Sequence, residues 1–157
     1  MSELLKGKTT TWFALCVFLA SCGQDKPPRN AADLTIHAAS DEAVPGWNVV
    51  KFSDASQGEI WVEPTPALTL DDLRSGEQTR DELGRASIAI RFTKPGAEKM
   101  RKFSSDHIGK KAAIVFEGKV MNAPMILSEI SSSAMITAGA SGLSEDQTQR
   151  ILALVNQ

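Results

Sequence analysis

The chain of 157 residues is short of several residue types that particular functions require. It contains no tyrosine, two histidines and two cysteines, and aromatic residues make up 6% of it. So few aromatic side chains disfavour an aromatic-lined ligand cleft or a platform for stacking nucleobases. A formal net charge of −2 disfavours non-specific nucleic-acid binding, which requires a cationic surface. Beyond the N-terminal apolar stretch, no run approaches the roughly 20 apolar residues that span a membrane.

The residues that could serve in catalysis or metal binding lie in sequence patterns typical of structural roles. His37 and His107 are not at metal-ligand spacing from another strong ligand, so we expect no metal site and no cofactor. His107 falls near the predicted end of a helix, where packing or capping accounts for it. The run Gly139-Ala140-Ser141-Gly142 resembles a nucleophile elbow but lacks the second glycine at the required place. We therefore expect no enzymatic activity, and a hydrolase is the least favoured alternative.

The N-terminus has the pattern of a bacterial lipoprotein signal. Lys6 and Lys8 precede an apolar stretch, Trp12 to Ala20, and the run Leu19-Ala20-Ser21-Cys22 closes it. We expect residues 1–21 to be cleaved and Cys22 to be acylated, which would anchor the protein to a membrane through lipid. The alternatives are an uncleaved N-terminal anchor or a buried helix.

Cleavage and acylation would fix the cysteine chemistry and the location. Cys16 would leave with the signal and Cys22 would be modified, so no disulfide, thiol nucleophile or cysteine metal site would remain. The protein would lie on the periplasmic side of a bacterial membrane. Gly23, in place of an aspartate, favours the outer over the inner membrane. Residues 22–32 are polar and contain a proline pair, which predicts a flexible tether.

Hydrophobic periodicity predicts an α+β fold. Residues 33–58 predict N-terminal strands, and a short helix is expected over residues 70–75. Further strands are expected at residues 85–92, 112–116, 119–122, 125–127 and 134–137. Thr93 and Pro95 predict a helix that ends near Ile108, and a Ser144/Gln147 capping box predicts another that ends near Val155. The order indicates a two-layer sandwich with two main helices on one face of a mostly antiparallel sheet.

Within residues 59–157 a series of motifs resembles one known family. The motifs are Thr93-Lys94-Pro95-Gly96-Ala97, Ile108-Gly109-Lys110, Ala113-Ile114-Val115-Phe116-Glu117-Gly118-Lys119-Val120, Ala123-Pro124-Met125-Ile126 and Ile136-Thr137-Ala138-Gly139. In order and spacing they resemble the head subdomain of the first periplasmic domain of SecD and SecDF, subunits of the protein-export machinery. The chain lacks the transmembrane helices of that family, and Ala138 interrupts its usual Ile-Thr-Gly motif. The resemblance therefore implies a head-like domain without proton-driven activity.

The resemblance implies a non-catalytic, lipid-anchored periplasmic binding module that contacts exported polypeptides or an envelope or Sec complex. The expected partner is a protein of the cell envelope. The candidate contact residues follow the predicted hairpin, where flexible methionines suit promiscuous apolar contacts: Met121, Ala123, Pro124, Met125 and Ile126. The alternative interpretation is that these residues form the core and a sheet edge.

A second hypothesis rests on the charge distribution. Between residues 85 and 119 basic residues outnumber acidic ones, and Lys99, Arg101 and Lys102 fall on the predicted helix. A basic surface of this kind would let a structural lipoprotein recruit a specific envelope partner. The alternative interpretation is a solvated helix face with no partner.

Overall fold

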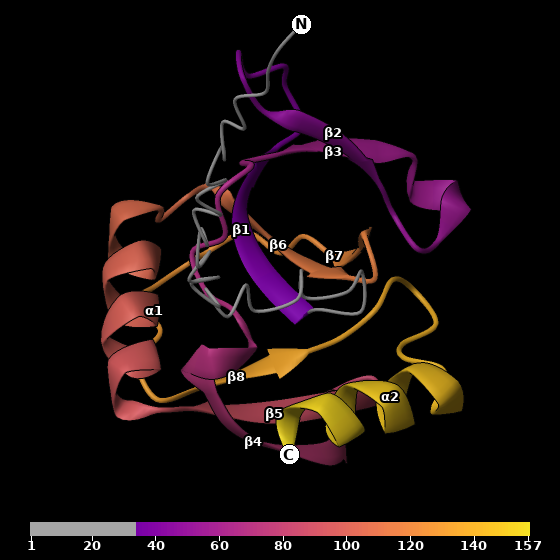
Figure 1. The fold of residues 1–157 in the computed structure, drawn as a ribbon. Helices are drawn as coiled ribbons and strands as arrows, with labels where there is room; N and C mark the ends of the chain where they lie inside the picture. The colour runs from indigo at the N-terminus through magenta and orange to yellow at the C-terminus, as the bar shows by residue number, and fades with distance from the viewer. Residues whose placement is uncertain (1–33) are drawn as a thin grey trace, which may run out of the picture.

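The computed structural model describes residues 34–157 (Figure 1). The predicted signal, Cys22 and the tether lie outside the described residues, so lipidation stays a prediction. The proposed boundary between residues 33–58 and 59–157 likewise stays a prediction.

The strands form two antiparallel sheets. The five-stranded sheet has the order β2-β3-β1-β6-β7, with β1 Leu34–Ser40, β2 Asn48–Lys51, β3 Glu59–Val62, β6 Lys111–Phe116 and β7 Lys119–Asn122. The three-stranded sheet has the order β4-β5-β8, with β4 Leu73–Arg80, β5 Ala86–Phe92 and β8 Ser133–Ile136. The helices are α1 Lys94–Asp106 and α2 Glu145–Val155, with short 3-10 turns at Ala55–Gln57 and Leu70–Asp72.

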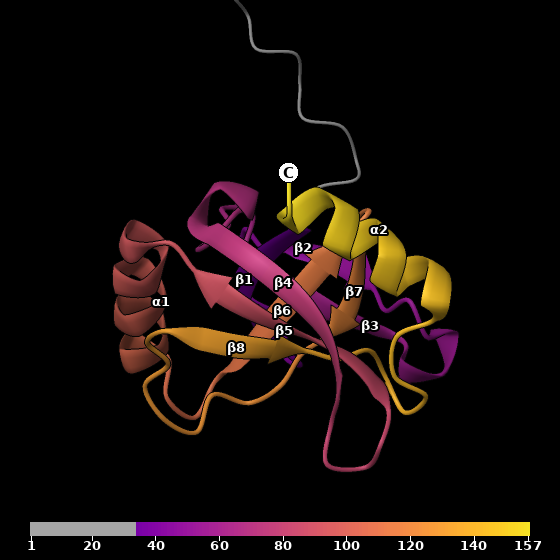
Figure 2. The same ribbon diagram turned by 90° about the horizontal axis from the view of Figure 1, so that it is seen from below.

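The main core is shared by both sheets and both helices. Ile88 and Ile90 of β5 are fully buried and lie in one cluster with Leu34 of β1. Met100 of α1 and Ile151 of α2 join the same cluster. Figures 1 and 2 show α1 and α2 flanking this core on different sides. Each helix therefore presents its apolar stripe to the same interior.

A smaller cluster lies on the other face of the five-stranded sheet. Its buried members are Ala39, Ile60, Val62, Ala113 and Val120. In Figure 1, β2 and β3 arch above β1, β6 and β7. Ser53 N–H donates to the Val120 carbonyl at 2.8 Å, and Phe52 forms a parallel β-bridge with Val120. The sheet thus curls far enough to bring the ends of β2 and β7 together.

The structure confirms the α+β class, the mostly antiparallel strands and the two main helices. It divides the strands between two sheets, so the helices pack against a core that both sheets share. The Glu117-Gly118 hairpin is also confirmed, with positive φ at both residues as a tight two-residue turn requires. The helix expected over 70–75 is wrong: a 3-10 turn ends at Asp72 and β4 begins at Leu73. The strand expected over 125–127 is reduced to a single antiparallel bridge between Met125 and Lys111.

The N-terminal end of α1 is fixed by a close backbone approach, which we call the Asp72 junction (Asp72, Thr93, Gly96 and Lys99). Thr93 N–H donates to the Asp72 carbonyl at 2.9 Å, and the Thr93 hydroxyl accepts from Gly96 N–H at 3.1 Å. A Cβ on Gly96 would lie 2.1 Å from the Asp72 carbonyl oxygen. Glycine is therefore the residue that this approach permits.

Candidate functional site

The five predicted apolar contact residues divide between core and surface. Met121 and Ile126 are 1% and 4% exposed and belong to the main core. Pro124 and Met125 are exposed, and Ala123 is half-buried. Burial removes Met121 and Ile126 from direct contact with a partner, whereas Met125 is 53% exposed and available to one.

Backbone pairing explains this division. Ala112 N–H donates to the Pro124 carbonyl at 3.0 Å, and Ile126 N–H donates to the Lys110 carbonyl at 2.8 Å. Residues 124–126 therefore run beside the start of β6 as an extended segment, in which successive side chains point to opposite sides. Ile126 faces the core, so Met125 and Leu127 face outward.

Sequence reasoning missed two neighbours of Met125. Leu127 is 80% exposed, and Ile108 is 56% exposed just beyond the end of α1. Gly109 N–H donates to the Ile126 carbonyl at 2.8 Å, which holds Ile108 beside the 125–127 segment. We call Ile108, Met125 and Leu127 the apolar patch. The alternation across Ile126 would have identified Leu127, but the proximity of Ile108 depends on the tertiary pairing.

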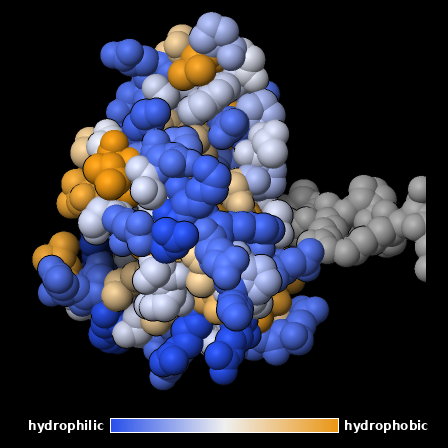
Figure 3. All heavy atoms as spheres, turned by 90° about the vertical axis from the view of Figure 1, so that its left-hand side faces the viewer, coloured by the Kyte–Doolittle hydropathy of each residue, from blue (hydrophilic) through white to orange (hydrophobic). Residues whose placement is uncertain are grey.

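A groove of about 530 Å³ adjoins the apolar patch at Met125. Trp47 and Val44, from the loop between β1 and β2, form apolar parts of its wall. Lys111 Nζ lies 2.7 Å from Asp41 Oδ2, and both residues line the groove. In Figure 3 the face that carries α1 is largely hydrophilic, with apolar atoms gathered toward its left-hand edge. The molecule thus offers apolar contact area at a limited part of this face.

The three predicted basic contact residues are engaged in ion pairs. Lys99 Nζ lies 2.8 Å from Asp72 Oδ1, whose side chain is 5% exposed. Lys102 pairs with Asp106 at 2.8 Å on the exposed face of α1, and Arg101 lies 3.9 Å from Glu129. Side-chain hydrogen bonding and the charge of Lys102 lower the pKa of Asp106. These pairs neutralise much of the expected positive surface, and Lys99 has a structural role at the Asp72 junction.

Both histidines make structural hydrogen bonds. His37 Nδ1–H donates to the Glu63 carbonyl at 2.8 Å, and its Nε2 lies 2.9 Å from Thr35 Oγ1. Burial lowers the pKa of His37, although the bond to Glu63 opposes that shift. His107 Nδ1–H donates to the Phe103 carbonyl at 2.8 Å at the C-cap of α1, which confirms the capping and packing role.

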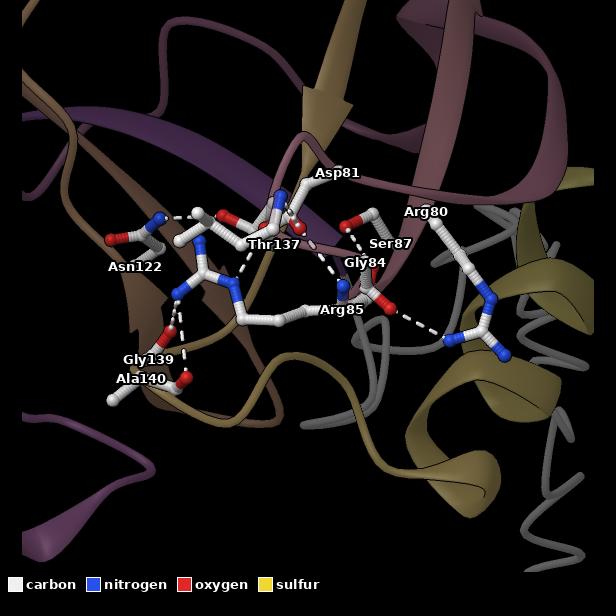
Figure 4. A network of polar contacts seen from close by, with 10 residues as sticks. Arg80, Asp81, Gly84, Arg85, Ser87, Asn122, Thr137, Gly139 and Ala140 are labelled. Carbon is white, nitrogen blue, oxygen red and sulfur yellow. Dashed lines mark hydrogen bonds and ion pairs between the residues drawn. The ribbon is translucent and has the colours of Figure 1, made fainter.

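A polar network ties the β4–β5 turn to the loop before α2 (Figure 4). Arg85 Nε donates to Asp81 Oδ2 at 2.6 Å, and Arg85 also donates to the Gly139 and Ala140 carbonyls at 3.3 Å each. Burial raises the pKa of Asp81, but hydrogen bonds from Arg85 and Leu83 outweigh it, so the pKa lies below its ordinary value. Every charged member of this network has a partner within it, and the bonds anchor the two loops to each other.

A metal site and a membrane-spanning helix each require a recognisable arrangement of residues. Among residues 34–157, no three histidine, cysteine, aspartate or glutamate side chains converge as metal ligands would. In the same range, neither helix has the length and apolar character that crossing a membrane requires. The apolar patch and its groove are therefore the strongest candidate site on the described domain.

Comparison with known proteins identifies one family over most of the described residues. The family described as SecDF, P1 head subdomain, matches residues 47–155. The SecD protein translocase subunit of Aquifex aeolicus is 37% identical over 100 residues, which cover 62% of this chain and 19% of that protein. The SecD protein translocase subunit of Koribacter versatilis is 31% identical over 136 residues, 87% of this chain and 22% of that protein.

A solved structure extends the likeness to three dimensions. The crystal structure of SecDF in its super-membrane-facing form superposes with a TM-score of 0.64 at 26% identity, covering 80% of this chain and 19% of that one. The chain thus spans about a fifth of the length of each of these three proteins.

Proposed function

The chain belongs to the SecDF P1 head family, and from that premise we propose that it is a non-catalytic, protein-export related binding module of the cell envelope. Its partner is an exported polypeptide or a protein of the export machinery. A lipid on Cys22 holds it to the periplasmic side of a membrane. This assignment transfers only a head-like binding role, because the match covers a small part of each relative.

The apolar patch beside the groove is the observation that carries the proposal. Ile108, Met125 and Leu127 are large apolar side chains, each more than half exposed, that backbone pairing holds in one region. Contiguous exposed apolar surface marks interaction sites more often than isolated residues do. Methionine adds adaptability, which suits partners of varied sequence.

Site-specific photocrosslinking in cells tests the proposal. A photoreactive residue at Met125 or Leu127 should crosslink to exported polypeptides or export proteins, identified by mass spectrometry. The matched control is Glu98, which is exposed on α1 away from the patch. Equal yields at Glu98 and Met125, or no envelope protein at either patch position, would contradict the proposal.

The lipid anchor has a separate test. Cys22→Ala should abolish lipid labelling and membrane fractionation, while circular dichroism of the purified protein stays that of the wild type. Membrane fractionation that persists in this variant would show that Cys22 is not the anchor.

The basic-surface hypothesis is weaker, because Lys99, Arg101 and Lys102 have acidic partners. Its fairest test uses Lys94 and Lys110, which are exposed and form no ion pair within residues 34–157. Capture that weakens with salt and with the variant K94E/K110E would favour a basic surface. Salt-insensitive capture would favour the apolar patch.

A further inference from the structure

The two edges of the three-stranded sheet differ in how they are protected. On β4, the Asn156 side chain accepts from Gly76 N–H at 2.9 Å and donates to the Gly76 carbonyl at 3.0 Å. An amide side chain thereby takes the place of a neighbouring strand. Arg74, Glu77 and Arg80 add charges along the same strand, and charge discourages pairing with another chain.

The opposite edge, β8, lacks these protections. Its four residues, Ser-Ala-Met-Ile, carry no charge. Among residues 34–157, β8 pairs with β5 alone, and Figure 2 shows it as the outermost strand on the side away from β4. An uncharged edge strand of this kind can accept a further strand.

The register identifies the backbone groups that point outward. In an antiparallel pair, residues alternate between exchanging hydrogen bonds with the partner strand and pointing away from it. Phe92 N–H donates to the Ser132 carbonyl, which places Ala134 and Ile136, two and four residues on, in the bonded set. The N–H and C=O groups of Ser133 and Met135 therefore point away from β5.

The β4 edge supports this assignment independently. Gly76 lies opposite Ile90, and Ile90 lies opposite Ala134 on the other side of β5. Since Ile90 bonds toward β8, Gly76 must direct its N–H and C=O away from β5. That is where Asn156 meets them.

A hollow lies next to the open edge on the outer face of the sheet. It has a volume of about 330 Å³ and is lined by Ser133 of β8 together with Ala89 and Arg91 of β5 and Glu77 of β4. Met135 is 47% exposed. Strand addition combines backbone hydrogen bonds along an edge with recesses for side chains, and this hollow reaches the β8 edge at Ser133.

We propose that the outer edge of β8 binds an extended, uncharged segment of an exported polypeptide as an added strand. This inference rests on the proposed function and names its binding mode. A polypeptide can continue past both ends of β8 and place side chains in the hollow. Two copies of this chain joined through β8 would share only a four-residue ladder. The hollow contains one acidic and one basic residue, Glu77 and Arg91, so it favours neither an acidic nor a basic peptide segment.

The test measures binding of a fluorescent ten-residue peptide of alternating threonine and valine to the full chain purified in detergent. Met135→Pro removes one outward N–H without removing a bond to β5, and Gln78→Pro is the matched change on the β4 edge. We expect M135P to lower affinity at least tenfold and Q78P to leave it within twofold. If M135P folds poorly, Met135→Lys replaces it in the test. This variant keeps the backbone N–H and should also weaken binding, because a charge on the edge opposes strand pairing.

Backbone-methylated peptides test the same edge on the unmodified protein. Of two peptides of this sequence, the one N-methylated at every residue should lose binding and the unmethylated one keep it, because strand pairing requires backbone N–H groups that face β8. Equal binding of both, or equal effects of M135P and Q78P, would overturn strand addition while crosslinking at Met125 still upholds the proposed function. Absence of peptide binding and of crosslinking would overturn both. A dimer in sedimentation that M135P dissociates would make a second copy the occupant and overturn the inference.

Discussion

The two ends of α1 contrast a locked junction with an open surface. At the N-terminal end, Gly96 lies against the Asp72 carbonyl, and Lys99 pairs with the buried Asp72 carboxylate. At the C-terminal end, Ile108 lies beside Met125 and Leu127, all exposed. One helix is thus closely packed at one end and carries exposed apolar surface at the other.

The contrast separates residues that hold the fold from residues that are available to a partner. Substitutions at the Asp72 junction should change the free energy of unfolding and leave binding by the folded protein intact. Substitutions in the apolar patch should weaken binding and leave the free energy of unfolding unchanged. Experiments that compare the two ends therefore test whether the assignment of structure and binding is correct.

The largest expected effect is at Gly96. In a helix, Gly→Ala ordinarily stabilises by up to about 1 kcal/mol. Here the added Cβ would lie 2.1 Å from the Asp72 carbonyl oxygen, so α1 must shift and lose its junction bonds. We expect Gly96→Ala to lower the free energy of unfolding by about 4 kcal/mol, above the roughly 1–3 kcal/mol typical of overpacking, because the obstructing atoms belong to the backbone.

Urea unfolding of the purified domain followed by circular dichroism measures this change. Glu98→Ala, on the exposed side of the same turn, is the control and should change stability by less than about 0.5 kcal/mol. A Gly96→Ala protein as stable as the wild type would break the contrast, because the N-terminal end would not be locked.

Two methionines, Met121 in the core and Met125 beside the C-terminal end of α1, give the next largest effect. Met121 is 1% exposed, so Met121→Ala should cost about 3 kcal/mol of unfolding free energy through lost packing and a cavity. Met125 is 53% exposed, and Met125→Ala should cost less than about 0.5 kcal/mol. The same unfolding measurement applies to both. If Met125→Ala proved as damaging as Met121→Ala, the apolar patch would be part of the core.

Local sequence signals predicted the second half of the fold well. Alternation at β5, the Thr93 and Ser144 caps and the Glu117-Gly118 turn each depend on neighbouring residues, and all are confirmed. β4 was missed because its sequence, LRSGEQTR, offers one buried apolar residue. Its strand state comes from pairing with β5 and from the Asn156 cap, which is 80 residues away in sequence.

The candidate site was only partly predictable for the same reason. Composition singled out the 121–126 segment, but the strand register decides that Met121 and Ile126 point inward and Met125 outward. The charge count suggested a basic surface, whereas the acidic partners Asp72 and Glu129 come from distant segments. Pairings between distant residues cannot be deduced from local periodicity.

A smaller effect distinguishes the lysines at the two ends of α1. Lys99→Ala should lower the free energy of unfolding by about 1 kcal/mol, because the nearly buried Asp72 carboxylate would lose its cation but keep the Thr69 N–H bond. The expected loss is modest because Lys99 itself is largely exposed and solvent screens the pair. Lys110→Ala should change stability by less than about 0.5 kcal/mol, because Lys110 forms no ion pair within residues 34–157. Chemical unfolding at low and high salt measures both, and equal losses for the two variants would mean that the Asp72 pair adds nothing to the locked end.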